Sequence, residues 1–318
     1  MSTAEYSLRS SGEVVSVNIS LRKGTSKSPV LEIKITERGA EGDAHAGDWH
    51  RQVSLLGLEN IESFSQKHGR RVSPGEFAEN ITLRGIDLSR ARLLDRFEIG
   101  ECRLELTQIG KKCHGESCAI FREVGTCLMP REGVFCRVLQ GGRVRPKDPA
   151  RHWQRRWKFS LLVMSDRSAA GRRPDSSGPA LRRWVEEFGS RQGLDCHASL
   201  EVLPDDAERL RSRLEEDLAN GVDVALVSGG TGIGPRDTTP EVVSAFCQKL
   251  LPGVMEAIRA KTGENNPLAQ LSRSVAGVRE KMLVYAMPGS PRAVAEYTAE
   301  IEKTLLHAFC MLHGLDVH

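Results

Sequence analysis

The spacing of hydrophobic residues changes once along the chain, near residue 158. Before that point, short runs with the composition of β-strands follow one another, among them EVVSVNIS, VLEIKI and RLELTQI, and segments rich in Gly, Pro, Asp and Arg separate them. Long helical stretches are few in this part. The pattern predicts a mostly β N-terminal domain over residues 1–148, with a barrel-like or sandwich sheet.

After residue 158, strands and helices alternate. FSLLVMS is followed by a helix from about Pro179, the strand CHASLEVL and the charged helix DDAERLRSRLEEDLANG. The strand VDVALVSGG, the helix PEVVSAFCQKL, the strand MLVYAMPGS and a last helix from about Pro291 continue the pattern. Strands that are apolar throughout and alternate with helices are typical of a parallel sheet covered on both faces. We therefore expect a doubly wound, mostly parallel α/β sheet over residues 159–318.

Between the two patterns lies PKDPARHWQRRWK, with two prolines, several basic residues and two tryptophans. Tryptophan and arginine together also occur in nucleic-acid and membrane contacts. We interpret residues 149–158 instead as a linker whose aromatic side chains pack on a domain.

Length and composition support this division. The 318 residues exceed the size of about 250 to 300 residues at which single cores stop growing, so two domains are expected. A net charge of +3 is too small to predict nucleic-acid binding. The N-terminus lacks the apolar core of a signal peptide, and no run of 18 apolar residues occurs, so we expect a cytoplasmic protein without a membrane partner. Its eight cysteines are then expected to be thiols.

The strongest chemical signal is SGGTGIGPRDTTPE, residues 228–241. In open α/β sheets, ligands bind beyond the carboxyl ends of the strands, and this segment follows one. Its glycines allow the backbone to approach an anion closely, and the helix that follows adds the positive end of its dipole. Arg236, Asp237 and Thr239 bring a cation, a carboxylate and a hydroxyl to the same loop.

Three further segments follow predicted strands. SDRSAAGRRPDSSGP begins at Ser165 and also fits a long surface loop, Asp205 in LPDD also fits a helix N-cap, and MPGSP with Ser290 also fits a plain turn. Two anion-binding loops and two carboxylates at one sheet edge predict a nucleotide handled with a divalent cation. The sequence GxxxxGK[ST] is absent, which excludes a standard P-loop enzyme.

In this order, SDR, PDD, SGGTGIGPRDTTPE and MPGSP resemble the motifs of the molybdopterin adenylyltransferase family, and LSRSVAGVR is similar to a later helix of that family. The resemblance covers residues 159–318. It implies that ATP and molybdopterin react to adenylylated molybdopterin and pyrophosphate, and that the C-terminal domain forms a homotrimer. It also implies that Asp205 and Asp237 hold Mg²⁺ and orient the α-phosphate. The remaining implied contacts are Ser165, Asp166, Arg167, Gly229, Gly230, Thr231, Gly232, Arg236, Thr239, Pro288, Gly289 and Ser290.

In the N-terminal half, GAEGDAHAGDWHRQVSLLG, PGEFAENIT, LLDRFEIGECRLELTQIGKKCHGESCAI and CLMPREGVF together resemble the MOSC domain, the C-terminal domain of molybdenum cofactor sulfurase. The match spans roughly residues 10–148. It implies that Cys113 carries sulfur or binds the metal of a molybdenum or tungsten cofactor, because a thiolate is a soft ligand. The cofactor contacts suggested by these segments are His45, His50 and Arg51, with Glu76, Asn80 and Arg131 as weaker candidates.

The other cysteines of this region leave two alternatives open. Cys118, Cys127 and Cys136 together with His114 suit a zinc site, although the spacing lacks CxxC pairs. Each of them also suits a buried, inert thiol.

These observations predict an enzyme of molybdenum cofactor biosynthesis, with molybdenum insertase and molybdoenzymes as acceptor partners. The alternative is a protein that binds molybdopterin or its metal complex and delivers it without turnover. For the N-terminal domain alone, a resistance factor acting on N-oxidised compounds also remains open.

Overall fold

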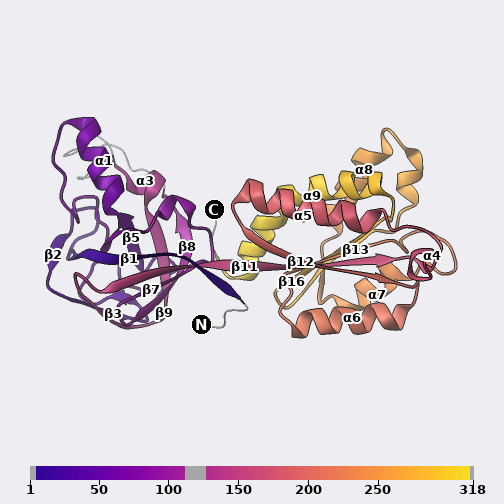
Figure 1. Ribbon diagram of the computed structural model, residues 1–318, viewed down its shortest axis with the longest axis horizontal. Helices are drawn as coiled ribbons and strands as arrows, with labels where there is room; N and C mark the ends of the chain where they lie inside the picture. Colours follow the sequence, from indigo (N-terminus) through magenta and orange to yellow (C-terminus); the bar gives the residue numbers. More distant parts are fainter. Residues whose placement is uncertain (1–4, 112–126, 316–318) are drawn as a thin grey trace. The chain divides into compact units, whose positions relative to one another are not determined.

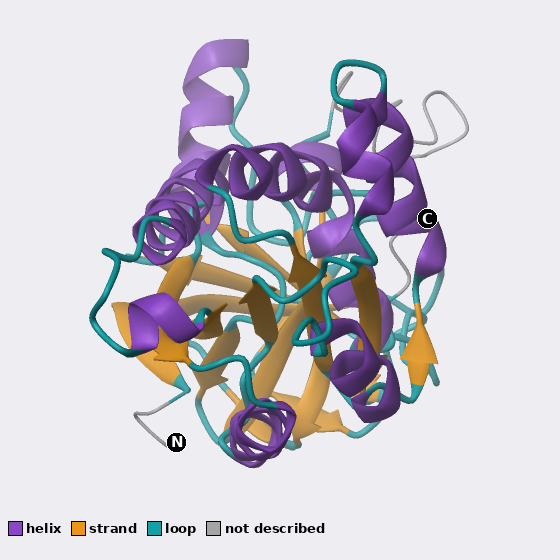
Figure 2. Cartoon of the chain, turned by 90° about the vertical axis from the view of Figure 1, so that its right-hand side faces the viewer, coloured by secondary structure: helices purple, strands orange, loops and turns teal. Residues whose placement is uncertain are grey.

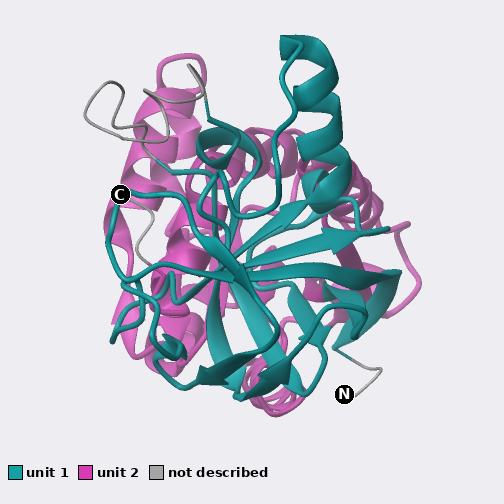
Figure 3. Ribbon diagram, turned by 90° about the vertical axis from the view of Figure 1, so that its left-hand side faces the viewer, with its two compact units in different colours: residues 1–155, 318 teal, residues 156–317 magenta. Residues whose placement is uncertain are grey.

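The computed structural model describes residues 5–111 and 127–315. Cys113, Cys118 and His114 therefore lie outside the described residues. The chain forms two compact units, of which unit 1 extends to Arg155 and unit 2 begins at Arg156 (Figure 3).

Unit 1 is built mainly of antiparallel strands. Their pairings run from β11 through β7, β8, β9, β5, β6 and β1 and return to β11, with β5 and β6 as a parallel pair. The strands of this circuit are β1 (Tyr6–Ile19), β5 (Val53–Gly57), β6 (Ile81–Arg84), β7 (Arg96–Ile99), β8 (Cys102–Ile109), β9 (Val134–Gln140) and the first part of β11 (Pro149–Met164). β2 (Ser28–Val30) pairs with β1, and β3 (Ile33–Thr36), β4 (Gly39–Ala40) and β10 (Gly142–Val144) form a small separate sheet.

One helix of unit 1 was not predicted from the sequence. α1 (Leu58–His68) buries Leu58, Ile61 and Phe64, and it ends at Gly69, whose φ of 60° suits glycine. Three apolar residues in an otherwise polar segment give a weak helical pattern, which explains why this helix was not predicted. Among its described residues, unit 1 also contains the shorter η1 (Leu88–Arg90) and α3 (Met129–Glu132).

The expected linker at residues 149–158 is part of β11. Pro149 occupies the first position of the strand, where its missing N–H is tolerated. Ala150, His152 and Gln154 alternate as buried residues, and His152 Nε2 lies 2.7 Å from Asp95 Oδ2. The prolines and charges suggested a linker, whereas this period of two residues is the pattern of a strand.

Unit 2 contains a sheet in the order β12–β11–β13–β16–β15–β14. β11 pairs in parallel with β12 (Asp195–Leu203) and β13 (Val224–Ser228), and β13 pairs in parallel with β16 (Met282–Met287). Helices flank both faces, with α5 (Ser177–Gln192) and α9 (Pro291–Leu312) on one and α6 (Ala207–Ala219) and α7 (Thr239–Phe246) on the other (Figures 1 and 2). The predicted α/β architecture of this half is confirmed.

Residues of β11 pack alternately on the two helical layers. Phe159 makes edge contacts with Trp184 and Phe188 of α5. Leu162 belongs to the core that includes Leu210 of α6 and Val243 of α7. Burial on both faces is the reason why this strand is apolar throughout.

The segment LSRSVAGVR is not a helix, so this expectation was wrong. Its last residues form β15 (Val275–Arg279), antiparallel to β16 and to the edge strand β14 (Lys249–Leu250). Val275 and Val278 are β-branched, which suits a strand. α8 (Pro252–Gly263) and η3 (Pro267–Leu271) precede it. Within the described parts of the chain, no helix is long and apolar enough to cross a membrane.

Candidate functional site

Four polar segments meet at one edge of the sheet of unit 2. They follow β11, β12, β13 and β16, which are neighbouring parallel strands. The carboxyl ends of such strands lie at the same edge, where ligands of open α/β sheets bind.

The loop after β13 depends on two left-handed glycines. Gly229 has a φ of 108° and Gly230 a φ of 63°. A Cβ atom on Gly229 would lie 2.3 Å from the carbonyl oxygen of Met164, and one on Gly230 would lie 2.4 Å from Oγ1 of Thr239. Thr239 is buried beneath the loop, and its N–H donates to the Gly230 carbonyl at 3.2 Å.

The loop after β16 touches the first one. A Cβ on Gly289 would lie 3.2 Å from the Cα of Gly229, so the two backbones are in close contact. Ser290 is the N-cap of α9, and its Oγ accepts a hydrogen bond from the Ala293 N–H at 3.2 Å. α9 spans 22 residues, so the positive end of its dipole is presented at this loop.

Both loops line one cavity of about 550 Å³. This volume lies within the range of about 300–1,000 Å³ that small-molecule sites occupy. The cavity is also lined by residues of α8, of the segment around η3 and of α9: Thr262, Asn266, Leu268, Ala269, Leu271, Ser272, Arg292, Ala293, Glu296 and Tyr297. Eight predicted site residues line the cavity: Gly229, Gly230, Thr231, Gly232, Asp237, Pro288, Gly289 and Ser290.

The Asp237 carboxylate is held against the glycine-rich loop. Its Oδ2 accepts a hydrogen bond from the Gly234 N–H at 2.8 Å and would lie 2.8 Å from a Cβ on Gly232. Oδ1 accepts no hydrogen bond from the residues that the structure describes. One carboxylate oxygen is therefore open to the cavity's ligand.

Asp205 lies in a second cluster, beyond β11 and β12, and does not line the cavity. The N–H of Asp166 donates to Asp205 Oδ2, and the N–H of Asp205 donates to Asp166 Oδ1, both at 3.1 Å. Arg236 joins them, since its guanidinium donates to Asp166 at 2.9 Å and to the Asp205 carbonyl at 3.2 Å. The structure thus brings together Asp166, Asp205 and Arg236. No hydrogen bond joins Asp205 to Asp237.

Two other polar residues of this edge cap helices. The N-cap of α6 is Asp206, whose side chain accepts from the Arg209 N–H at 3.0 Å, so the N-cap alternative for Asp205 was wrong by one residue. Ser165 caps the short α4 (Asp166–Ala169), which contains Arg167. Neither Ser165 nor Arg167 lines the cavity.

Arg273 is one residue of this site that sequence reasoning missed. Its Nε donates to the Gly232 carbonyl at 2.7 Å, and its guanidinium also donates to the Asp237 carbonyl at 2.5 Å. The backbone N–H of Arg273 donates to the Thr231 carbonyl at 2.9 Å. The side chain also pairs with Glu241, and this hydrogen bond holds the pKa of the Glu241 carboxyl below its usual value. One indication of its importance was present in the sequence, because Arg273 lies in LSRSVAGVR, a segment that resembles the family.

In unit 1, the predicted cofactor contacts lie on the loop between β4 and β5. The backbone N–H of His45 donates to Asp43 Oδ1 at 2.9 Å, and the carbonyl of His50 accepts from Thr107 Oγ1 at 2.5 Å. The Arg51 guanidinium lies 4.6 Å from the centre of the Trp49 ring.

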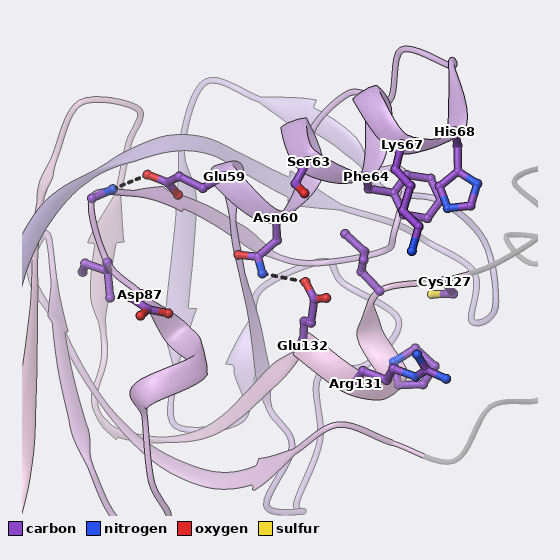
Figure 4. A pocket seen from close by; sticks show the side chains of 14 residues that line it. Glu59, Asn60, Ser63, Phe64, Lys67, His68, Asp87, Cys127, Arg131 and Glu132 are labelled. Carbon is purple, nitrogen blue, oxygen red and sulfur yellow. Dashed lines mark hydrogen bonds between the residues drawn. The ribbon is translucent and has the colours of Figure 1, made fainter. Parts of the chain in front are cut away.

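The weaker candidates are dispersed over unit 1. Asn80 is buried and accepts from Ser54, and Glu76 pairs with Arg70. Arg131 lines a separate cavity of about 740 Å³ between α1 and α3 (Figure 4). Its acidic side chains are engaged there, with Glu132 accepting from Asn60 at 2.5 Å and Glu59 from the Gly85 N–H at 2.8 Å. The cationic side chains of Lys67 and Arg131 line the same cavity as Cys127.

The described cysteines give no support to a zinc site. Burial raises the pKa of the Cys102 thiol to about 12 and holds that of Cys136 well above its usual value, as expected for inert thiols. Over residues 5–111 and 127–315, no group of three or more His, Cys, Asp or Glu is placed to hold a metal ion.

Two family models match the chain. The model described as "Probable molybdopterin binding domain" matches residues 160–308, and the model described as "MOSC domain" matches residues 42–151. One match lies within each unit.

Curated relatives agree with these matches. A molybdopterin adenylyltransferase of Pyrococcus furiosus is 34% identical over 156 residues, which are 48% of this chain and 88% of that protein. A molybdopterin adenylyltransferase of Helicobacter pylori is 34% identical over 43% of this chain and 77% of its own length. A molybdenum cofactor biosynthesis bifunctional protein of Synechococcus elongatus is 32% identical over 49% of this chain and 48% of its own. The chain spans about half the length of this bifunctional relative.

Proposed function

This chain belongs to the molybdopterin adenylyltransferase family, and from that premise we propose that unit 2 transfers the adenylyl group of ATP to molybdopterin in molybdenum cofactor biosynthesis. One observation carries the proposal. Two touching glycine-containing loops and the Asp237 carboxylate line a single cavity at the carboxyl edge of a parallel sheet.

In the proposed reaction, a phosphate oxygen of molybdopterin attacks the α-phosphorus of ATP. A new P–O bond forms, the bond between the α- and β-phosphates breaks, and pyrophosphate leaves with the electron pair. Reactions of this kind need positioning and charge neutralisation more than a covalent nucleophile. The residues at the cavity fit that need.

The phosphates are held by groups of both loops. Backbone N–H groups around Gly230 and Gly232 and the N-terminal end of α9 supply positive partial charge. The Ser290 hydroxyl donates to a phosphate oxygen, since its own oxygen already accepts from Ala293.

Asp237, at the cavity, and Asp205, in the neighbouring cluster with Asp166, are the residues that would hold the Mg²⁺ that accompanies ATP. Each uses Oδ2 as an acceptor, and Oδ1 of each accepts no hydrogen bond from a described residue. Mg²⁺ needs one or two carboxylates and completes its shell with phosphate oxygens and water. The bound ion would neutralise charge on the leaving pyrophosphate.

The test is an assay of the purified chain with molybdopterin, ATP and Mg²⁺. We expect adenylylated molybdopterin and one pyrophosphate per product, measured by chromatography and a coupled pyrophosphate assay. Tight binding of molybdopterin without product would favour the alternative, a protein that binds and delivers the pterin without turnover.

For unit 1 we propose binding of a molybdenum or tungsten cofactor, with Cys113 as metal ligand or sulfur carrier. The match to the MOSC domain and the loop with His45, His50 and Arg51 support this role, and the closed circuit of strand pairings supports a barrel-like fold. Cys113→Ser should lose cofactor metal or transferable sulfur and keep adenylylation. Unchanged metal and sulfur content would assign the role to another residue.

We also propose a homotrimer formed through unit 2, and delivery of the product to a molybdenum insertase and then to molybdoenzymes. The support is the family resemblance of residues 159–318. Multi-angle light scattering should give about three times the mass of one 35.1 kDa chain. A monomer would contradict the trimer without bearing on the adenylylation assay.

A further inference from the structure

The cavity of unit 2 is lined by one charged pair that the proposed reaction does not use, Arg292 and Glu296 of α9. Among the described residues that line this cavity, Arg292 alone has a cationic side chain, whereas Asp237 and Glu296 bring two carboxylates. The ligands proposed for the cavity all carry negative phosphate groups. Arg292 is therefore the lining side chain whose charge attracts them.

The position of Arg292 is unfavourable for the helix itself. α9 begins after its N-cap, Ser290, and its first turn contains no acidic residue. A cation in this turn faces the positive end of the helix dipole, where carboxylates are stabilising. α1 has the favourable arrangement, with Glu59 in its first turn and Lys67 in its last. Helix stability therefore gives no reason for a cation at residue 292.

The ion pair that Arg292 forms is also in the less favourable order. Its Nε lies 2.8 Å from Oε1 of Glu296, four residues later on the same helix. Pairs of this spacing stabilise a helix more when the acid precedes the base. The two side chains are 69% and 33% exposed, so water screens the pair and its contribution is small. A ligand with more negative charge can therefore displace Glu296.

The guanidinium has further donors for such a ligand. In the part of the chain that the structure describes, neither Nη1 nor Nη2 of Arg292 donates to an acceptor. Together they form a planar fork that can bind two phosphate oxygens at once. Ser290 and the N–H groups at the start of α9 lie at the same helix end and suit a neighbouring phosphate.

We propose that Arg292 binds a polyphosphate, and that Glu296 holds the guanidinium while the cavity is empty and gives it up when the ligand arrives. The ligand class is a di- or triphosphate, because its adjacent phosphate groups can occupy the helix end and the fork together. Glu296 acts through Arg292, since its carboxylate competes with the ligand and so favours release of pyrophosphate. The inference deepens the proposed adenylylation and rests on it for the identity of the ligand.

The exchange is tested by binding of inorganic pyrophosphate to the full chain, measured by isothermal titration calorimetry with Mg²⁺ present throughout. Arg292→Met should raise Kd at least about ten-fold, since charge-assisted hydrogen bonds are lost. Glu296→Gln should lower Kd about two- to five-fold, which corresponds to an exposed ion pair that no longer competes. Unchanged Kd values, or values that move in the same direction in both variants, would contradict the proposal.

The double variant shows whether Glu296 acts through Arg292. When Glu296→Gln is added to Arg292→Met, Kd should stay near that of Arg292→Met, because the cation for which the carboxylate competes is gone. The same tightening in both backgrounds would mean that Glu296 repels the ligand directly, and it would overturn the exchange.

A lysine at residue 292 separates charge from side-chain size. Arg292→Lys should bind pyrophosphate more tightly than Arg292→Met and more weakly than the wild type, since an ammonium keeps the charge and lacks the fork. A lysine variant that binds no better than the methionine variant would contradict the role of the cation.

Stability distinguishes this role from a structural one. Thermal unfolding of Arg292→Met should occur near the wild-type temperature, because the lost pair is weak and repulsion by the helix dipole is relieved. A clear loss of stability would give the weaker binding a structural cause and would count against the proposal.

The matched control is Glu187→Gln on α5 of the same unit. It removes the carboxylate of another exposed pair at a spacing of four residues, in which Glu187 lies 3.7 Å from Arg191. Its Kd for pyrophosphate should equal that of the wild type, and tightening as large as in Glu296→Gln would assign the effect to overall charge. Because pyrophosphate binding needs neither molybdopterin nor turnover, a failure here is distinct from a failed adenylylation assay.

Discussion

The side-chain Nε of Arg273 donates to the carbonyl oxygen of Gly232 at 2.7 Å, across 41 residues of sequence. The same guanidinium donates to the Asp237 carbonyl, and it pairs with Glu241 at the start of α7. One side chain thus fixes the backbone on both sides of Gly234. We expect the loop to be held in its ligand-binding conformation before the nucleotide arrives.

Replacing Arg273 should therefore impair nucleotide binding. In Arg273→Lys, a single ammonium cannot span the acceptors that the planar guanidinium reaches. We expect kcat/KM for ATP to fall at least about ten-fold, mostly through KM, since each lost charge-assisted bond costs roughly 1.5–3 kcal/mol. The matched control is Arg279→Lys, whose wild-type side chain pairs with Glu215 at 2.8 Å on the same unit. Unchanged kinetics in Arg273→Lys would show that the loop keeps its conformation without it.

Asp237→Asn should lower the adenylylation rate and leave the fold intact. The amide oxygen can still accept from the Gly234 N–H, so the loop conformation is retained while the negative charge is lost. Loss of one preorganised electrostatic group costs roughly 10²–10³-fold in kcat. The control is Asp206→Asn, the same change at the N-cap of α6, where asparagine caps equally well. Wild-type turnover in Asp237→Asn would remove the residue from the proposed mechanism.

Arg236→Ala should have a smaller effect. The Arg236 and Asp166 side chains are 65% and 41% exposed, and ion pairs at such exposure contribute about 0–1 kcal/mol. We expect KM for ATP to rise about two- to five-fold and kcat to stay near the wild-type value. A double-mutant cycle with Asp166→Ala measures the coupling. A loss of turnover as large as that of Asp237→Asn would mean that Arg236 contacts the substrate.

Most of the fold of unit 2 could be predicted from the sequence, because its strands and turns are marked by short stretches of neighbouring residues. Apolar strands such as Leu161–Met164 are buried on both faces, and each is followed by a segment with glycine, proline or a cap. The loop of Gly229 and Gly230 could be predicted for the same reason, since its conformation excludes other residues. The strands and these two glycines can be predicted because each depends mainly on residues close to it in the sequence.

Contacts between distant segments could not be predicted in this way. Arg273 reaches the loop only because β15 lies beside β16, and Asp43 meets Lys27 through pairings that no local pattern encodes. The segment that contains Arg273 was interpreted as a helix, so the contact of its side chain with the glycine-rich loop could not be predicted. The buried Lys27 lies in the polar stretch LRKGTSKSPV, which looks like an exposed loop. Tertiary packing decided each of these positions.

Glu79→Gln should change how the local stability of unit 1 depends on pH. Burial raises the pKa of the Glu79 carboxyl, against the opposing hydrogen bond from the Gly75 N–H. A carboxyl with a raised folded pKa contributes stability that is fully present below its unfolded pKa of about 4.3 and is lost as pH rises through the folded value. Glutamine is neutral and keeps both acceptor contacts of Oε1, so the variant should lack this loss.

Hydrogen–deuterium exchange of residues 70–84, corrected for intrinsic exchange rates, measures this effect. With rising pH, protection should fall in the wild type and stay level in Glu79→Gln. Glu76→Gln, a change in a more exposed carboxylate of the same segment, serves as control and should follow the wild type. Parallel pH profiles for the wild type and Glu79→Gln would refute the prediction.

Ser290 combines two roles that substitutions can separate. Its hydroxyl oxygen caps α9 by accepting from the Ala293 N–H, and the residue lines the cavity. Ser290→Ala loses the cap and should cost about 1 kcal/mol of unfolding free energy, with a moderate rise in KM for ATP. Ser290→Asp keeps a capping carboxylate and places a negative charge at the proposed phosphate site, so it should retain stability and raise KM for ATP far more than the alanine variant does. Denaturant unfolding followed through the tryptophans of unit 2, together with ATP titrations, gives both quantities. If Ser290→Asp binds ATP as well as the wild type, Ser290 caps the helix and does not contact the phosphates.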